Sequence, residues 1–401
     1  MSDNRDPIVI IGARRTPIGS FQGALSSLSG PALGGVAIAG ALAQAGVPPD
    51  MVDEVLMGNC LMAGVGQAPA RQALRAAGLP VSVPATTLSK MCGSAMKTVM
   101  LAHDQLLAGT AGVLVAGGME SMSQAPYLLP SARAGQRLGH GQMVDHMFFD
   151  GLQDAYDGQL MGVHADRVAQ RLGFDRASQD AWALRSVQRA QAAVTQGLFN
   201  DEISPVALPA AKGTSSRTVN QDEAPGQCQP DKIGRLKPAF RSADDGGTIT
   251  PASSASISDG AAALVLCRES TAITKGWRPL ARLLAHSTHA AEPGDFASAP
   301  VGAIRKLFTR TGWQAADVDL YEINEAFAVV PMIAVRELGL DDERVNVRGG
   351  ACAMGHPIGA TGARIIVTLL HALAQTGGTR GVASLCIGGG EATAVALERL
   401  G

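Results

Sequence analysis

The stretch TTLSKMCGSAMKTVMLAHDQLLAG, residues 86–109, joins a β-prone run to a helix pattern. Four apolar residues recur at helical spacing: Met96, Val99, Met100 and Leu106. Gly109 stands where such a helix would end. Because apolar strands that lead into apolar helices are typical of layered α/β folds, the stretch predicts that fold class, with Cys92 at the N-terminus of a buried helix.

The same alternation of strands and helices extends upstream of this stretch. Strand-like and helix-like segments follow one another as IVIIGARRTP (8–17), GPALGGVAIAGALAQAG (30–46), VDEVLMG (52–58) and PARQALRAAG (69–78). The sequence therefore predicts several βα steps before Cys92.

Two internal echoes indicate a duplication. VDEVLMGN (52–59) resembles VDLYEINE (318–325) at an offset of 266, and VLVAGGMES (113–121) resembles SLCIGGGEA (384–392) at an offset of 271. A stretch between them carries polar loops and a charged helix, so it reads as an insertion. We expect an N-terminal half over 1–120 that resumes at 246–272, an inserted loop domain over 121–245, and a C-terminal half over 273–401.

Composition excludes several classes of protein. The chain has 401 residues, 46% hydrophobic, with a net charge of -2, which describes a globular protein without a basic footprint for nucleic acid or anionic membranes. Its first apolar run covers only Ile8 to Ile11, too short for a signal peptide or a membrane span, so we expect a cytoplasmic protein. Six cysteines without a CxxC pair predict free thiols and no metal site.

Four segments carry side chains with chemical potential. Cys92 at a helix start would have a lowered pKa and a reactive thiolate. The alternative is that Cys92 packs in the core as a small apolar residue. His356 lies in the glycine-rich GGACAMGHPIGATGAR (349–364), which is neither a P-loop nor a paired-histidine metal helix; a hydrogen-bonded packing histidine is the alternative.

The other two segments end strands. Cys386 in LCIGGGEA (385–392) precedes a glycine turn whose amides, Gly388 among them, are available to an oxyanion, or it is a structural strand end. Asn324 in YEINEAFA (321–328) follows an apolar strand and precedes a helix with Ala326 and Phe327 on its apolar face, where asparagine is often a cap. In α/β folds such strand ends are where sites form.

In this order and spacing, MCGSAM, NEAFA, GGACAMGHPIGATGAR and CIGGG resemble the signature set of the thiolases over essentially the whole chain. The subgroup most resembled is the acetyl-CoA acetyltransferases, which interconvert two acetyl-CoA with acetoacetyl-CoA and CoA. The resemblance implies a five-layered αβαβα fold made of two duplicated halves, with an inserted loop domain covering the CoA. It also implies a homo-oligomer, dimer or tetramer, a place in fatty acid metabolism, and no cofactor besides coenzyme A as substrate.

Carried over residue by residue, the resemblance makes Cys92 the acylated nucleophile, His356 its base and Cys386 the acid/base for the substrate α-proton. His356 with a water held by Asn324 would stabilise the enolate, and the amides of Cys92 and Gly388 would stabilise the tetrahedral intermediate. Substrate contacts would come from six residues: Leu152, Met161, Ser254, Phe296, Ala326 and Phe327.

The chain departs from the family pattern at a few positions. Ala255 replaces a serine that contacts pantetheine in the family, with Ser254 beside it. Around Gly226 the chain lacks the arginine that many members place near the nucleotide. Leu160 replaces a histidine, and Ala95 replaces a glycine. The CoA contacts at these positions are left open. Bulky Phe296 and Met161 favour a short acyl chain.

Three other functions remain compatible with the residues. A broad-range 3-ketoacyl-CoA thiolase of fatty-acid or aromatic degradation has the same catalytic set. In a cysteine hydrolase, water would resolve the acyl-enzyme, and Cys386 would have no task. A non-catalytic or redox-controlled scaffold would use Cys92 and Cys386 as a disulfide pair or for packing.

Overall fold

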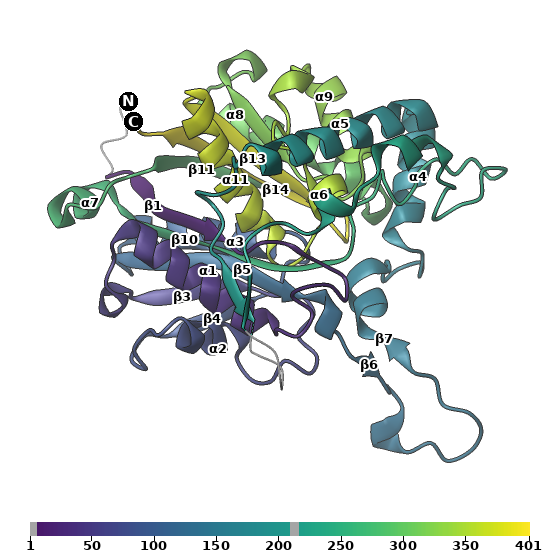
Figure 1. Ribbon diagram of the computed structural model, residues 1–401, viewed down its shortest axis with the longest axis horizontal. Helices are drawn as coiled ribbons and strands as arrows, with labels where there is room; N and C mark the ends of the chain where they lie inside the picture. Colours follow the sequence, from purple (N-terminus) through teal and green to yellow (C-terminus); the bar gives the residue numbers. More distant parts are fainter. Residues whose placement is uncertain (1–5, 209–215) are drawn as a thin grey trace.

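The protein has two α/β halves whose sheets meet at one corner. The structure is a computed structural model and describes residues 6–208 and 216–401. The strands of the first half are β1 (Ile8–Arg15), β3 (Glu54–Gly58), β4 (Ala85–Leu88), β5 (Val113–Ser121) and β10 (Ser258–Arg268). Those of the second are β11 (Ala281–Ala290), β12 (Leu320–Ile323), β13 (Arg380–Ile387) and β14 (Glu391–Arg399). Figure 1 shows the first half below the second.

The duplication is visible in the strand order. Apart from the edge strand β4, which pairs with β3 in the first half alone, the order is β3-β5-β10-β1 in the first half and β12-β13-β14-β11 in the second. Within each series the first pair is parallel and the next two are antiparallel. The halves connect where β1 pairs with β11 through Val9 and Ile10. Two copies of one topology therefore make up the layered body, as the sequence predicts.

The offset of 271 predicted for the second pair of similar segments is wrong. Glu54 pairs with Leu114 in the first half, and Leu320 pairs with Gly381 in the second. Position 114 therefore corresponds to position 381, an offset of 267 rather than 271. The glycines of the two segments are not equivalent, because Gly117 lies inside β5 and Gly388 follows the end of β13.

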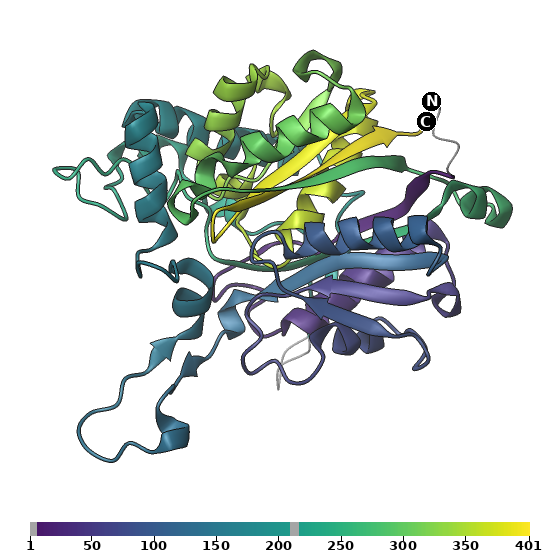
Figure 2. The ribbon, with the colours of Figure 1, turned by 180° about the vertical axis from the view of Figure 1, so that it is seen from behind.

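Five layers follow from where the helices pack. α1 (Gly30–Ala45) and α2 (Pro69–Ala76) cover the outer face of the first sheet, and α8 (Ala299–Thr311) and α9 (Val329–Leu338) lie on the outer face of the second. Between the sheets lie α3 (Ser94–Ala108) and α11 (Thr361–Thr376), which share one core with strands of both halves. Figure 2 shows this arrangement from behind. Short α7 (Glu269–Lys275) and α10 (Ala351–Met354) complete the two halves.

The helix ends match the sequence. Ser29 caps α1 by accepting a hydrogen bond from the Ala32 amide, and Gly109 ends α3 in a left-handed conformation with φ of 76°. A difference occurs at α9, which begins at Val329, so Ala326 and Phe327 lie in the preceding loop and not on the helix face. That loop places both side chains against a cavity instead.

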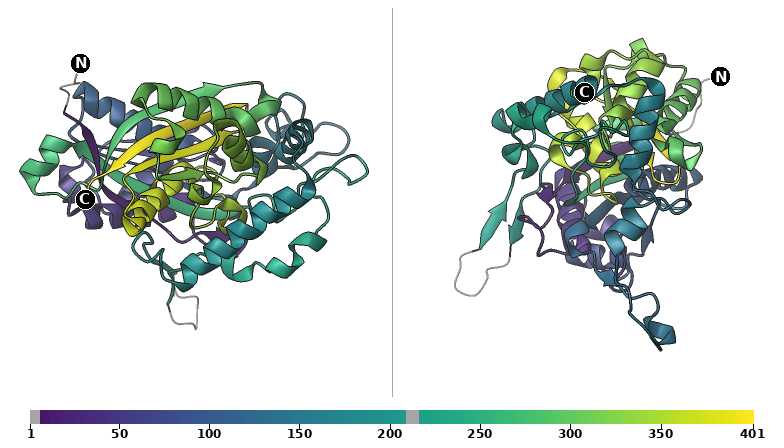
Figure 3. Two further views of the ribbon diagram at one scale, coloured as in Figure 1. Left: turned by 90° about the horizontal axis from the view of Figure 1, so that it is seen from above. Right: turned by 90° about the vertical axis from the view of Figure 1, so that its right-hand side faces the viewer.

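The segment between β5 and β10 forms no third copy of the repeat. Its elements are β6 (Tyr127–Leu128), β7 (Val144–Asp145), α4 (Met161–Leu172), α5 (Arg176–Thr195), β8 (Val206–Leu208), β9 (Arg217–Val219) and α6 (Ala224–Gln227). β6 and β7 form the base of an extension that projects from the body, and α4 and α5 lie against one end of the second half (Figures 1 and 3). Among the described residues, no helix is long and apolar enough to cross a membrane.

Candidate active site

A cavity of about 350 Å³ opens where the two halves and the inserted segment meet. It is lined by Cys92, His356, Cys386 and Gly388 from the predicted catalytic set. All six predicted substrate contacts also line it: Leu152, Met161, Ser254, Phe296, Ala326 and Phe327. Asn324 is not among the lining residues. Residues nearly three hundred positions apart in the chain thus share one chamber.

Cys92 lies on a tight turn between β4 and α3. The Ser94 hydroxyl accepts a hydrogen bond from the Lys90 amide at 2.8 Å and donates one to the Met91 carbonyl at 2.6 Å, which fixes the turn. A Cβ at Gly93 would lie 2.4 Å from Cδ1 of Ile387. Glycine at position 93 therefore lets the end of β13, which carries Cys386, come close to the Cys92 turn.

The pKa of Cys92 differs from the sequence expectation. Burial raises it to about 11, even though hydrogen bonds from the Gly388 amide and from its own amide lower it. The expectation of a lowered pKa at the helix N-terminus is wrong for this structure, because desolvation outweighs the backbone donors. At neutral pH Cys92 is a thiol, so its deprotonation must accompany its attack on a substrate.

His356 is arranged to accept that proton. Burial, with a smaller contribution from the Arg364 charge, lowers its pKa to about 3, so the ring is neutral. Its Nδ1 lies 2.7 Å from Oγ1 of Thr361, whose own proton goes to the Pro357 carbonyl at 2.9 Å. Nδ1 must therefore carry the ring proton. Nε2 is left with a free lone pair and has no hydrogen-bond partner among the described residues.

Cys386 ends β13, where the chain turns through three glycines. The side chain is 1% exposed, and burial together with the charge of Cys92 raises its pKa well above the ordinary value. Cys386 lines the same cavity as Cys92. Directly after this strand, the Gly388 amide points to the Cys92 sulfur. This turn thus supplies both a second thiol and a backbone donor.

Asn324 lies behind the cavity wall rather than in it. It continues the strand pairing through its amide, which donates to the Ser384 carbonyl at 3.0 Å. Its side chain is 1% exposed, and neither Oδ1 nor Nδ2 has a partner among the described residues. A buried amide with both ends free is suited to bind an ordered water. The alternative of a helix cap does not hold, because α9 starts five residues later.

Glu325 anchors the loop that carries Asn324. Its carboxylate accepts hydrogen bonds from Trp182 Nε1, Asn346 Nδ2, the Ser186 hydroxyl and the Cys352 amide. The first and third donors lie on α5 of the inserted segment. A fully satisfied buried carboxylate therefore joins that segment to the second half beside the site.

Glu120 performs a similar task in the first half, and the sequence analysis did not single it out. Its carboxylate accepts hydrogen bonds from Asn59 Nδ2, from the Cys60 and Leu61 amides, and from the Gly359 amide. Burial raises its pKa to about 7. Because Gly359 is three residues from His356, this contact positions the histidine loop. No local pattern marks Glu120, since its partners are distant in the sequence.

Part of the cavity wall is aromatic. Phe296 and Phe240 each meet Phe327 edge to face, with ring centroids 6.0 and 5.8 Å apart. Leu160, Ser254 and Ala255 also line this chamber. The Ser254 hydroxyl donates to the Thr250 carbonyl at 3.0 Å, so its proton is already used and it is a poor donor to a substrate. Gly226, in contrast, lines no part of this cavity.

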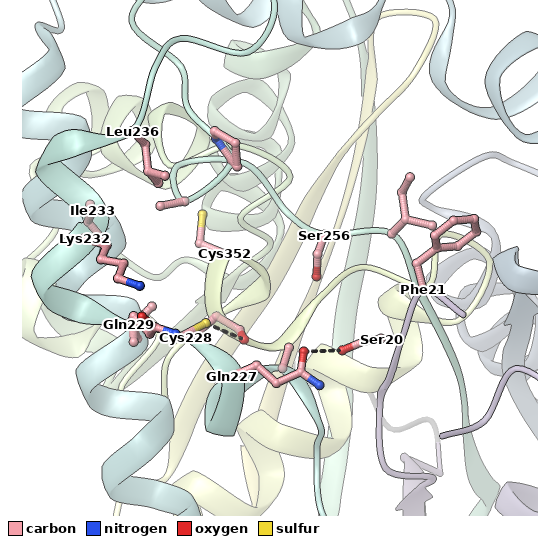
Figure 4. Close-up of a pocket in the computed structure, with 16 residues that line it drawn as sticks. Ser20, Phe21, Gln227, Cys228, Gln229, Lys232, Ile233, Leu236, Ser256 and Cys352 are labelled. Carbon is pink, nitrogen blue, oxygen red and sulfur yellow. Dashed lines mark hydrogen bonds between the residues drawn. The ribbon is translucent and has the colours of Figure 1, made fainter. Parts of the chain in front are cut away.

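A larger cavity of about 600 Å³ lies on the other side of the 251–257 segment. Cys228 and Cys352 line one side of it and Phe21 the other, as Figure 4 shows. Ile257 is the one residue that lines both cavities. Because none of the predicted catalytic residues lines the larger cavity, the smaller one is the candidate active site.

Comparisons with known proteins agree with this geometry. Residues 8–270 match the family described as "Thiolase, N-terminal domain" and residues 277–399 match "Thiolase, C-terminal domain". The chain is 45% identical to an acetyl-CoA acetyltransferase of Allochromatium vinosum, over 98% of this chain and 99% of that protein. It is 46% identical to acetyl-CoA acetyltransferase 2 of Arabidopsis thaliana, over 100% of this chain and 98% of that protein.

A solved structure is similar over its whole length. The Acat5 thiolase from Ascaris suum, crystallised in complex with coenzyme A, superposes with a TM-score of 0.92 at 39% identity. The match covers 98% of this chain and 100% of the other.

Proposed function

The chain belongs to the thiolase family, and from that premise we propose that it is an acetyl-CoA C-acetyltransferase. It would condense two acetyl-CoA to acetoacetyl-CoA and CoA, and cleave acetoacetyl-CoA with CoA in the reverse direction. The observation that supports this most is the convergence of two thiols, a neutral imidazole and a backbone donor on one cavity.

The first half of the reaction forms an acetyl-cysteine. The Cys92 sulfur attacks the thioester carbon as Nε2 of His356 takes the thiol proton. The oxyanion of the tetrahedral intermediate is stabilised by the amides of Cys92 and Gly388, and each such donor contributes on the order of 3 kcal/mol. CoA leaves as a thiolate and takes the proton of Cys386, which becomes the base for the next step.

The second half forms the carbon–carbon bond. The Cys386 thiolate removes a methyl proton from the second acetyl-CoA, and the enolate attacks the acetyl carbon on Cys92. Protonated His356 and a water on Asn324 stabilise the enolate oxygen. When the Cys92 thiolate leaves, the proton on His356 returns to it, so protons and charges balance over the cycle.

The experiment that tests this assignment is CoA-dependent cleavage of acetoacetyl-CoA by the wild type, Cys92→Ser and Cys386→Ser. We expect both substitutions to abolish most turnover, because each removes a thiol with its own task. Cys228→Ser is a matched control, since this thiol lines the other cavity, and should leave turnover unchanged. Unchanged rates in the first two variants would refute the roles, and release of free acid without CoA would indicate a hydrolase.

We also propose that the chain assembles as a homo-oligomer, dimer or tetramer. The extension around β6 and β7 exposes several large apolar side chains: Tyr127, Leu129, Leu138 and Met143. Exposed apolar groups of this kind are typical of protein interfaces. Light scattering coupled to gel filtration measures the mass directly, and a monomer at micromolar concentration would contradict the proposal.

A further inference from the structure

A cluster of two histidines and one aspartate lies outside the catalytic chamber. His103 and Asp104 lie on α3, and His286 lies on β11 of the other half. Nε2 of His286 is 2.9 Å from Oδ1 of Asp104, and Nδ1 of His103 is 3.4 Å from the same oxygen. None of the three residues lines the candidate active site. The acylation chemistry therefore gives this cluster no task.

The distances suit a first-row transition metal. One atom from each residue lies within 4.8 Å of the other two. Ligands about 2.0–2.2 Å from a tetrahedral zinc ion are roughly 3.4 Å apart, so small shifts of the side chains would complete the geometry. The two rings stand almost perpendicular, with centroids 5.2 Å apart, so their nitrogen atoms approach Asp104 without the rings overlapping. Two imidazoles and a carboxylate are ligands that zinc prefers.

The surroundings also suit a ligand set. The two histidine side chains are 10% and 15% exposed, whereas that of Asp104 is 52% exposed. An ion can thus enter from solvent, and a water can take the fourth position.

We propose that His103, Asp104 and His286 bind a divalent transition-metal ion of the zinc class, which ties α3 of the first half to β11 of the second. α3 begins beside Cys92, but His103 is eleven residues further on, roughly 16 Å along the helix axis. The ion is therefore structural and takes no part in acyl transfer. Its effect is to hold the central helix of one half to a strand of the other. His286 is 182 positions from Asp104, so no sequence motif marks this site.

The test is calorimetric titration of the full-length protein with Zn²⁺ near neutral pH, after treatment with a chelator. We expect one ion per chain in the wild type and at least about tenfold weaker binding in His286→Ala and in Asp104→Asn. His289→Ala is the matched control, because this histidine lies on the same strand outside the cluster and should leave binding unchanged. Asp104 is exposed, so its substitution keeps the test valid if His286→Ala folds poorly.

Thermal unfolding supplies a second readout. Zn²⁺ should raise the melting temperature of the wild type and of His289→Ala, because an ion that binds only the folded state stabilises it, and should not raise that of His286→Ala. Acetoacetyl-CoA cleavage should stay within about twofold of wild type in all three variants at the same temperature. Zinc binding that is equal in wild type, His286→Ala and Asp104→Asn would place the ion elsewhere and overturn the proposal. Absence of binding by the wild type would overturn it as well.

Discussion

In the proposed mechanism His356 acts as a base, because its neighbours determine which nitrogen carries the proton. Thr361 Oγ1 gives its proton to the Pro357 carbonyl and must accept from Nδ1, which leaves a free lone pair on Nε2. The amide of His356 is also held by the Ser256 carbonyl at 3.0 Å. A ring with the other tautomer would present a proton where the mechanism needs a lone pair.

Replacement of Thr361 by valine should slow the enzyme without unfolding it. The substitution keeps the shape of the side chain but removes the acceptor for Nδ1, so both tautomers become populated. We expect kcat/KM for acetoacetyl-CoA cleavage to fall about tenfold, which corresponds to about 1.4 kcal/mol. Thr361→Ser retains the hydroxyl and is the control. Equal loss of activity in both variants would assign Thr361 a packing role only.

The pKa values predict how Cys92 reacts with pH. An ordinary histidine pairs as a cation with a thiolate and gives a plateau of reactivity, but His356 with a pKa of about 3 stays neutral above that pH. Cys92 with a pKa of about 11 gains thiolate steadily as the pH rises. The rate at which iodoacetamide alkylates Cys92, measured on its peptide by mass spectrometry, should therefore rise about tenfold per pH unit from roughly pH 6 to 10. A flat rate over that range would show an ion pair instead.

At the scale of elements, the site depends on how closely α3 and α11 approach. A Cβ at Gly362 would lie 2.4 Å from the Met96 amide nitrogen, so no larger residue fits without separating the two central helices. Both helices begin at catalytic turns, the first after Cys92 and the second after His356. Their separation sets the distance between nucleophile and base.

Gly362→Ala should therefore destabilise the fold and reduce activity. We expect a loss of about 1–3 kcal/mol in the free energy of unfolding, the usual cost of overpacking a core, measured by urea titration. Gly30→Ala is the control, because a Cβ at that helix start meets its nearest atom at an ordinary 3.5 Å. The close contact between the helices would be disproved if the two variants were equally stable.

The sequence predicted these elements well but not their environment. Helix α3 and its end at Gly109 follow from apolar spacing and a glycine, because both are local signals. Which residues of β13 and β5 are equivalent in the two halves depends on packing between distant segments, and so does the raised pKa of Cys92. The spacing of residues in the sequence does not encode either. Glu120 was not predicted for the same reason, since only folding brings its partners to it. Thr361 lies four and five residues from its partners, Pro357 and His356, but the tautomer of the ring depends on the folded geometry of that turn.

At the scale of the whole molecule, the cavity limits the acyl group. The rings of Phe240, Phe296 and Phe327, together with Met161, line the chamber of about 350 Å³. We expect acetoacetyl-CoA to be cleaved at least about tenfold faster than a ten-carbon 3-ketoacyl-CoA, because the longer chain must displace buried aromatic groups. Phe296→Ala should lower the ratio of the acetoacetyl-CoA cleavage rate to that of the ten-carbon substrate. Equal rates in the wild type would favour the broad-range thiolase.

The convergence of both halves on one chamber is the property that the sequence motifs anticipated best. Cys92, His356 and Cys386 each lie at a strand or helix end, and the duplicated topology brings these ends together. The motifs resemble those of the thiolase family, and that resemblance predicts the catalytic set. The hydrogen bonds that orient the set became visible only in the folded chain.

The most direct test of this account is to find where the acetyl group goes. The protein is incubated briefly with acetyl-CoA, quenched with acid, digested and examined by mass spectrometry, in the wild type and in Cys386→Ser. We predict one acetyl group on Cys92 in both, with acetoacetyl-CoA formed by the wild type alone. An acetyl group on another residue, or none on Cys92, would contradict the account.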